Sequence, residues 1–221
     1  AQAKACRKPQ QAKVRTKVMD KKELFENACA VWKNDADALS RLINDINPEE
    51  YAAIFDLIRN CRGRIATLGM GTSSVAARKI AHMLCVANVP SFFVSAGDAA
   101  HGAFGAVQEG DVVIVLSKGG NTEELVNLIE SIKGKKLKLI TVTQNPQSRL
   151  AQAADVVLNL KVEESDHKHM LPTASIIAII AIFDAIADEL TKCPQFSDEA
   201  FYLNHNHGSV GAFLKGKIED K

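Results

Sequence analysis

The chain has 221 residues, of which 47% are hydrophobic and 24% charged, and its 27 basic and 26 acidic side chains give a formal net charge of +1. A chain of this length and composition can bury a substantial core, which excludes a disordered or fibrous protein. Proteins that bind nucleic acids or membrane surfaces usually carry an excess of lysine and arginine. The balanced charge therefore argues against both kinds of partner and favours a small, specific ligand.

The N-terminal 18 residues are basic and have no apolar periodicity. We interpret residues 1–18 as an extension outside the fold and predict that one domain occupies residues 19–221. At its start, apolar residues recur every three or four positions over residues 23–47, which predicts an amphipathic helix. Asn47 and Pro48 then supply an N-cap and a first helical residue for a second helix, which is expected to end near Arg59.

The central part of the chain alternates β-rich runs with helical patterns. Its five β-rich runs are RIATLG, SFFV, VVIVLS, LKLITVT and DVVLNL, and the helical pattern after the third is TEELVNLIESIK. Strict alternation predicts a five-stranded parallel sheet covered on both faces, a three-layer, doubly wound α/β fold with additional N-terminal helices. The continuous apolar run VVIVL predicts the central strand. A long helix over about residues 172–192, a short one near 197–203 and a tail with His205 and His207 are expected to follow.

Neither a membrane span nor a disulfide framework is indicated. The longest apolar stretch, residues 174–187, is interrupted by Asp184 and is shorter than the ~20 residues that cross a bilayer, so it is interpreted as a core helix. The five cysteines are scattered, odd in number and without C-x-x-C spacing. This usage is typical of reduced thiols, and we expect a cytoplasmic protein.

Two loops stand where parallel sheets bind ligands, beyond the carboxyl ends of strands. The first, GMGTSS, follows the first strand, and the second, SKGGNT, follows the third. Each combines glycines, hydroxyls and the free amides of a helix N-terminus, which together suit an anion such as phosphate. Neither is a complete dinucleotide fingerprint or a P-loop. The alternative for the second loop is purely structural, with Lys118 solvated and Thr122 only capping its helix.

A specific family pattern emerges from five segments in a fixed order and spacing: GMGTSSVAARKIAHML, PSFFVSAGDAAHGAFGAVQEGDVVIVLSKGGNTEEL, TVTQNPQSRLAQAADVVLNL, LPTAS and FYLNHNHGSVG. This combination resembles the sugar isomerase (SIS) domain, and most closely its arabinose-5-phosphate isomerase branch, which is used in making Kdo for lipopolysaccharide and capsule. The resemblance implies a flavodoxin-like strand order, a phosphosugar ligand and a homo-oligomer, dimer or tetramer, with sites at subunit contacts. It implies no metal and no cofactor, and a short form without the regulatory cystathionine-β-synthase-type domains.

The resemblance also assigns roles to residues. His101, in the AAHG segment, and His205 correspond to catalytic histidines, and in an oligomer His205 can be donated to a neighbouring subunit's site. The residues assigned to phosphate or sugar binding are Gly71, Thr72, Ser73, Ser117, Gly119, Gly120, Asn121, Thr122, Gln147 and Thr173.

Three positions depart from the family pattern. Isomerase members typically carry a lysine where this chain has Thr72, and carboxylates where it has Asn121 and Gln147. An amide cannot remove a proton beside a carbonyl, so isomerisation would need another base. We favour His101 or His205, because neutral imidazole titrates near physiological pH.

Three hypotheses remain open, and with them whether the chain is an enzyme. The first is an aldose–ketose isomerase that converts arabinose 5-phosphate to ribulose 5-phosphate. The second is a phosphosugar-binding sensor without catalysis, and the third an isomerase of another phosphosugar such as 6-phospho-3-hexulose. Glu163 and Glu164 are not interpreted as an acid–base pair, since adjacent residues on a strand point to opposite faces. His167 and His169 lack a third zinc ligand with diagnostic spacing.

Overall fold

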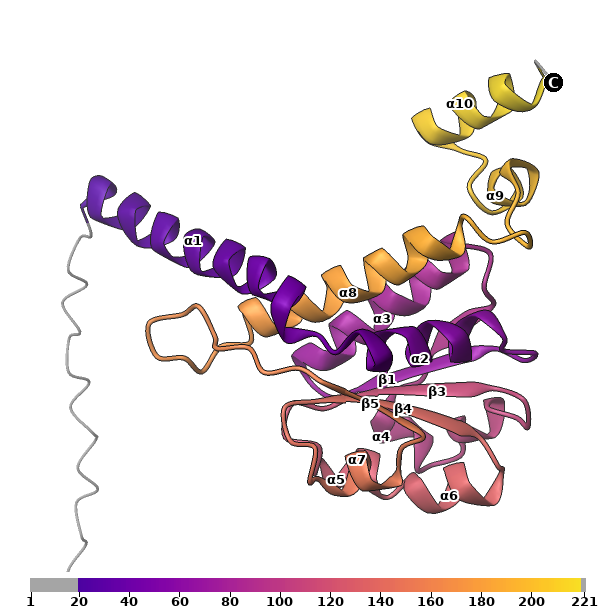
Figure 1. Ribbon diagram of the computed structural model, residues 1–221, viewed down its shortest axis with the longest axis horizontal. Coiled ribbons are helices and arrows are strands. Elements are labelled where there is room, and N and C mark those ends of the chain that lie inside the picture. The colour runs from indigo at the N-terminus through magenta and orange to yellow at the C-terminus, as the bar shows by residue number, and fades with distance from the viewer. Residues whose placement is uncertain (1–19, 220–221) are drawn as a thin grey trace, which may run out of the picture.

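The structure is a computed structural model that describes residues 20–219, so the expected extension over residues 1–18 lies outside the described residues. Figure 1 shows a parallel sheet with helices on both faces and helical arms that project from it. Among residues 20–219, no helix is both long and apolar enough to cross a membrane.

The sheet has five parallel strands in the order β2-β1-β3-β4-β5, which confirms the flavodoxin-like prediction. In β1, Ile65 lies beside Ser91 of β2 on one side and Val112 of β3 on the other. Every residue of β3 is buried, as expected for a central strand. The strands are β1 (Ile65–Gly69), β2 (Ser91–Phe93), β3 (Val112–Leu116), β4 (Lys138–Thr143) and β5 (Val156–Asn159).

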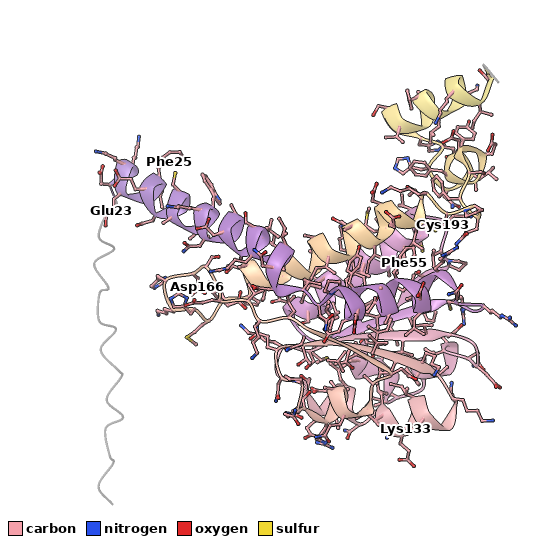
Figure 2. The ribbon with its side chains drawn as sticks, viewed as in Figure 1. Glu23, Phe25, Phe55, Lys133, Asp166 and Cys193 are labelled. Atoms are coloured by element: carbon pink, nitrogen blue, oxygen red, sulfur yellow. The ribbon has the colours of Figure 1, made fainter. Side chains whose placement is uncertain are left out.

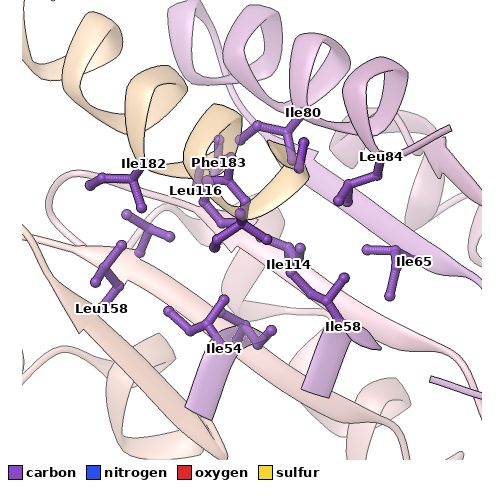
Figure 3. Close-up of a cluster of buried hydrophobic side chains, with 14 of the residues drawn as sticks. Ile54, Ile58, Ile65, Ile80, Leu84, Ile114, Leu116, Leu158, Ile182 and Phe183 are labelled. Atoms are coloured by element: carbon purple, nitrogen blue, oxygen red, sulfur yellow. The ribbon is translucent and has the colours of Figure 1, made fainter. Parts of the chain in front are cut away.

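Three helices cover one face of the sheet: α2 (Pro48–Arg59), α3 (Thr72–Val86) and α8 (Ala174–Leu190). They bury a core in which Phe183 of α8 and Ile80 of α3 meet Ile114 and Leu116 of the central strand (Figure 3). The Asn47 side chain accepts a hydrogen bond from Glu49 N at 2.9 Å and so begins α2 where the sequence predicts. The apolar stretch over residues 174–187 is a core helix, as interpreted.

The opposite face carries only short helices. Leu125, Ile132 and Leu150 pack there against the alternate residues of the strands, including Val113 and Val115. The helix predicted over the TEELVNLIESIK segment is divided into two short helices. Leu128 N bonds to Leu125 O, three residues back, and this tighter turn interrupts the helix. The elements are α4 (Ala96–Ala99), the 3-10 helix η1 (Ala103–Ala106), α5 (Glu123–Val126), α6 (Ile129–Gly134) and α7 (Arg149–Ala153).

Helical arms extend from both ends of this layered body (Figures 1 and 2). In α1 (Lys21–Asp45) only Ala38 is buried, while Trp32 is 58% exposed and packs edge-on against Phe25. At the other end, α9 (Asp198–Asn204) is followed by α10 (Gly208–Glu219). The tail expected after residue 203 thus contains a helix, α10, on which Phe213 is 70% exposed.

Candidate functional site

The two glycine loops lie next to each other at the carboxyl edge of the sheet. Gly69, the last residue of β1, pairs with Leu116, the last residue of β3, so the loop after each strand starts from the same place. Beyond that point the chain passes from β1 to the β2 side and from β3 to the β4 side. This divergence is the switch point at which open α/β sheets bind ligands.

The loop after β3 places two hydroxyl groups together. Ser117 Oγ is 3.0 Å from Thr122 Oγ1, and Ser117 is only 5% exposed. Gly120 N donates to both the carbonyl and the hydroxyl oxygen of Ser117, at 3.0 and 3.2 Å, which closes the loop. Thr122 is the N-cap of α5, but its side chain makes no capping bond. The Thr122 side chain thus contacts Ser117 and does not cap its helix.

Glycine is required at one position of this loop. Gly120 has φ +68°, a backbone conformation that side-chain-bearing residues rarely adopt, and a Cβ there would overlap the Ser148 side chain. Gly119, in contrast, has no neighbour within 4 Å of where its Cβ would lie. Ser148 in turn caps α7 through Ala151 N, so the turn after β3 packs directly on the start of that helix.

Asn121 holds two loops together. Its Oδ1 accepts from Arg149 N at 3.0 Å, and its Nδ2 donates to Gly119 O at 3.3 Å. Gln147 is exposed, and its backbone amide donates to Asn145 Oδ1 at 3.1 Å. The side-chain amide of Asn121 thus bonds to protein groups, whereas the side chain of Gln147 is exposed to solvent.

The loop after β1 presents the start of α3. Gly71, with φ +53°, is the N-cap of this helix, and its carbonyl accepts from Ser74 Oγ at 2.7 Å. Gly71 and Thr72 are exposed and Ser73 is half-buried. Ser73 lines a cavity between the ends of β3 and β4 and the first turn of α8. The other lining residues are Lys118, Val142, Thr143, Gln144, Leu160, Pro172, Ser175, Ile176 and Ile179.

Glu164 is a component of this edge that the sequence interpretation missed. Its side chain is 1% exposed and accepts four hydrogen bonds: from Lys118 Nζ at 2.6 Å, Ser175 Oγ at 2.6 Å, Thr173 N at 2.9 Å and Ser175 N at 3.2 Å. Burial alone would raise the pKa of this carboxyl, but the bonds from Lys118 and Ser175 outweigh burial and lower the pKa below its ordinary value. Lys118 is thus half exposed but paired with a buried carboxylate.

Spacing gave no indication of this pair, because the residues are 46 positions apart in the chain. The only available signal was Lys118 itself, a charged residue two positions after the end of a fully buried strand. Thr173, assigned to ligand binding, is the N-cap residue of α8, and its hydroxyl accepts from Ser165 N at 2.9 Å. Glu164 takes the place of an N-cap side chain by accepting from the first amides of α8.

The segment between β5 and α8 is organised by a second carboxylate, Asp166. Its Oδ1 accepts from Met170 N and Leu171 N, both at 2.9 Å, and its Oδ2 from Lys168 N at 3.0 Å. Figure 2 shows Asp166 within this projecting loop. Burial raises its pKa, but the backbone hydrogen bonds prevail and lower it. Within residues 20–219, no three His, Cys, Asp or Glu side chains form a metal-binding group.

The two candidate catalytic histidines are far apart in one chain. His101 follows α4, is exposed, and donates its backbone amide to Asp98 O. His205 ends α9, which is tied by a 3.2 Å bond from Asn204 to Asn88, just after the C-terminus of α3. Since the carboxyl-edge site lies at the N-terminus of this 15-residue helix, a length of about 20 Å separates His205 from its own chain's site. The structure does not bring His101 and His205 together.

Comparison with known proteins identifies a matching family and several relatives. The family described as the SIS domain matches residues 57–188. Arabinose 5-phosphate isomerase KdsD of Francisella tularensis is 34% identical over 199 residues, which cover 89% of this chain and 61% of the relative. The protein of the same name from Pseudomonas aeruginosa is 36% identical over 187 residues, or 84% and 57% of the two chains. This chain therefore spans about 60% of the length of these curated relatives.

Solved structures agree in fold. A Listeria monocytogenes protein provisionally described as a sugar-phosphate isomerase is 39% identical with a TM-score of 0.83, covering 86% of this chain and all of the other. An Escherichia coli CFT073 protein solved in complex with A5P is 30% identical with a TM-score of 0.80, covering 85% and 100%. Because the family match covers more than half of the chain and these structures match over their full length, the chain belongs to the SIS domain family.

Proposed function

We propose that this protein binds a phosphorylated sugar at the carboxyl edge of its sheet and interconverts arabinose 5-phosphate and ribulose 5-phosphate. The observation that carries the proposal is the pair of hydroxyls of Ser117 and Thr122, 3.0 Å apart in a loop at the switch point. The E. coli relative solved with A5P and the curated relatives named arabinose 5-phosphate isomerase support the choice of sugar.

The loop has the chemistry of a phosphate site. In their mutual hydrogen bond one of the two hydroxyls donates to the other, which orients both and leaves one O–H free to donate to a phosphate oxygen. The N-terminus of α3 lies at the same edge and carries partial positive charge that favours an anion. Of the residues assigned to the sugar, Ser73 has the best placement, because it lines the neighbouring cavity.

The proton-transfer role is proposed for His101, with His205 supplied by another subunit. Within one chain, His205 lies near the C-terminus of α3, whereas the site lies at the N-terminus of that helix. A complete site with both histidines therefore requires a second copy of the chain. The apolar side chains on the projecting arms support such a homo-oligomer, since isolated helices that expose large apolar groups usually pack against a partner. Examples are Leu24, Phe25, Trp32, Leu203 and Phe213.

A phosphosugar sensor without isomerase activity is the second candidate. It is favoured by Asn121, whose side chain bonds Arg149 N and Gly119 O and so serves the loops, at a position where isomerases typically carry a carboxylate. A neutral amide can hold a sugar hydroxyl but cannot accept a carbon-bound proton. Cytoplasmic placement is common to both candidates and is supported by the free thiols of Cys29, Cys61, Cys85 and Cys193.

Proton exchange separates the two candidates. The protein is incubated in D₂O with arabinose 5-phosphate, ribulose 5-phosphate and a panel of hexose phosphates, and deuterium entry beside the carbonyl is followed by NMR. An isomerase incorporates deuterium and loses this activity on His101→Ala. A sensor binds a phosphosugar, seen as thermal stabilisation, with no exchange on any sugar tested. Stabilisation by none of these sugars would contradict both candidates.

The phosphate loop and the shared site have separate tests. Ser117→Ala is expected to weaken phosphosugar binding, whereas Thr67→Val, which removes another buried hydroxyl from the neighbouring strand, should leave binding intact. For the shared site, inactive His101→Ala and His205→Ala proteins are unfolded and refolded together. Mixed oligomers should regain activity if each site takes its histidines from two subunits. Activity that never exceeds that of the separate variants would contradict the shared site.

A further inference from the structure

Lys118 lines the cavity next to the phosphate loop and carries an ammonium group at this edge of the sheet. It follows Ser117 directly, and its side chain lines the same cavity as Ser73 on the neighbouring loop. Both ends of the residue are fixed. Its carbonyl accepts from Gln144 N and Thr143 Oγ1, each at 3.0 Å, and its Nζ donates to Glu164 at 2.6 Å.

The ammonium still has donors to offer a ligand. An ammonium group has three N–H donors, and within the described part of the chain Glu164 is the one hydrogen-bond partner of Lys118 Nζ. The Lys118 side chain is 49% exposed although its partner is 1% exposed. Lys118 is thus held by a buried carboxylate while its own side chain remains half exposed.

Glu164 itself is unavailable to a substrate. A carboxylate accepts about four hydrogen bonds, and Lys118, Ser175 and the first amides of α8 already supply four. The same contacts lower its pKa after the opposing effect of burial, which makes it a weak base. Its negative charge is balanced by Lys118 and by the positive end of α8, so it need not repel a phosphosugar.

Resting on the proposed isomerase function, we propose that Lys118 is the catalytic cation of this site, replacing the lysine that other members carry at the position of Thr72, and that Glu164 is its positioning residue. Thr72 is the first residue of α3, directly after the loop that adjoins that of Lys118, and the next residue, Ser73, lines one cavity with Lys118. An ammonium on either loop can therefore serve the same space.

The role follows from the charge that develops during isomerisation. A base removes the proton from C2 of the open-chain aldose, the electrons of that C–H bond form the C1=C2 bond, and the carbonyl π electrons move to O1. Lys118 donates a hydrogen bond to O1 as it becomes negative. The proton of the C2 hydroxyl then moves to O1 as the C2 carbonyl forms, and C1 receives a proton. The ketose is complete without an external oxidant or reductant.

The test uses the full chain and compares K118M with a matched control, K138M. Lys138 also makes a 2.6 Å ion pair with a carboxylate, Asp155, and is 59% exposed, but it begins β4 at the opposite edge of the sheet. We expect K118M to lower kcat about 10²- to 10³-fold with little change in KM for arabinose 5-phosphate. K138M should keep the activity of the parent protein.

Relocation of the cation is the decisive experiment. Adding T72K to K118M should restore turnover, because the ammonium returns from the adjoining loop. E164Q should lower kcat less than K118M, and K118M/E164Q should be no less active than K118M, since Glu164 acts through Lys118. If K118M alone fails to fold, the double variant replaces it in the activity measurement, because E164Q removes the buried carboxylate that K118M leaves unpaired.

Three results would overturn the inference. If K118M keeps its kcat while the parent protein exchanges deuterium, the proposed function survives and Lys118 is not catalytic. If K118M raises KM and weakens inorganic phosphate binding at constant kcat, Lys118 is a phosphate ligand. If the parent protein exchanges no deuterium with any phosphosugar tested, both the inference and the isomerase function are wrong.

Discussion

Gly120→Ala tests whether the phosphate loop depends on one backbone conformation. The substitution places a methyl group at φ +68°, where it overlaps Ser148 and comes to 3.0 Å from Thr143 Oγ1. Left-handed backbone costs a residue other than glycine about 1–2 kcal/mol, and overpacking a tight contact adds about 1–3 kcal/mol. We therefore expect Gly120→Ala to lower the free energy of unfolding by about 2–5 kcal/mol.

The matched control is Gly119→Ala, the adjacent position, where a Cβ meets nothing within 4 Å. Its effect should stay within about 0.5 kcal/mol, as for most open surface positions. Urea unfolding followed by circular dichroism measures both losses of stability. For a chain of this size, the loss expected in Gly120→Ala corresponds to a fall in Tm of about 4–20 °C. Equal stability of the two variants would refute the steric argument. Normal phosphosugar affinity in a folded Gly120→Ala protein would show that the loop tolerates another conformation.

Three further predictions concern the core, a helix cap and pH. Phe183→Ala, at a position that is 1% exposed, should destabilise the protein by about 3–5 kcal/mol in urea unfolding, and a loss below about 1 kcal/mol would contradict its place in the core. Asn47→Ala removes the bond to Glu49 N and should cost about 1 kcal/mol by the same assay; no loss would mean that water replaces the cap. The pKa of Glu164 is lowered in the folded protein, so the ionised carboxylate stabilises the fold. This stabilisation is complete at pH values above the ordinary carboxyl pKa of about 4.3, and it is lost as the pH falls through the lowered pKa. Glu164→Gln should therefore flatten the acid side of a Tm-against-pH curve, and an unchanged acid side would contradict the role of this carboxylate.

The layered fold was predictable because its signals are local. Continuous apolar runs mark strands buried on both faces, and the VVIVL run is indeed the fully buried centre of the sheet. The cap at Asn47 likewise acts within two residues. The break in the helix after Val126 was not predictable, because Leu128 could continue the apolar pattern and only its packing selects the shorter turn.

The candidate site was predictable only in part. Ser117 and Thr122 belong to one loop, so their proximity followed from the spacing, and their mutual contact agrees with it. The Lys118–Glu164 pair joins the loop after β3 to the segment between β5 and α8, and its formation depends on how that segment folds back. The position of His205 depends on the path of the chain after α8, for which no periodic signal exists.

The pairing of β1 with β3 also affects the order in which the molecule forms. Ile65 pairs with Val112, whereas Ile140 of β4 pairs with Val156 only a short way along the chain. Closing a loop about three times as long costs about 1 kcal/mol more in chain entropy. We therefore expect the β1–β3 contact to form late in folding, and with it the place where the two ligand loops meet. A phosphosugar would then recognise only the finished protein, and would slow its unfolding without accelerating its folding.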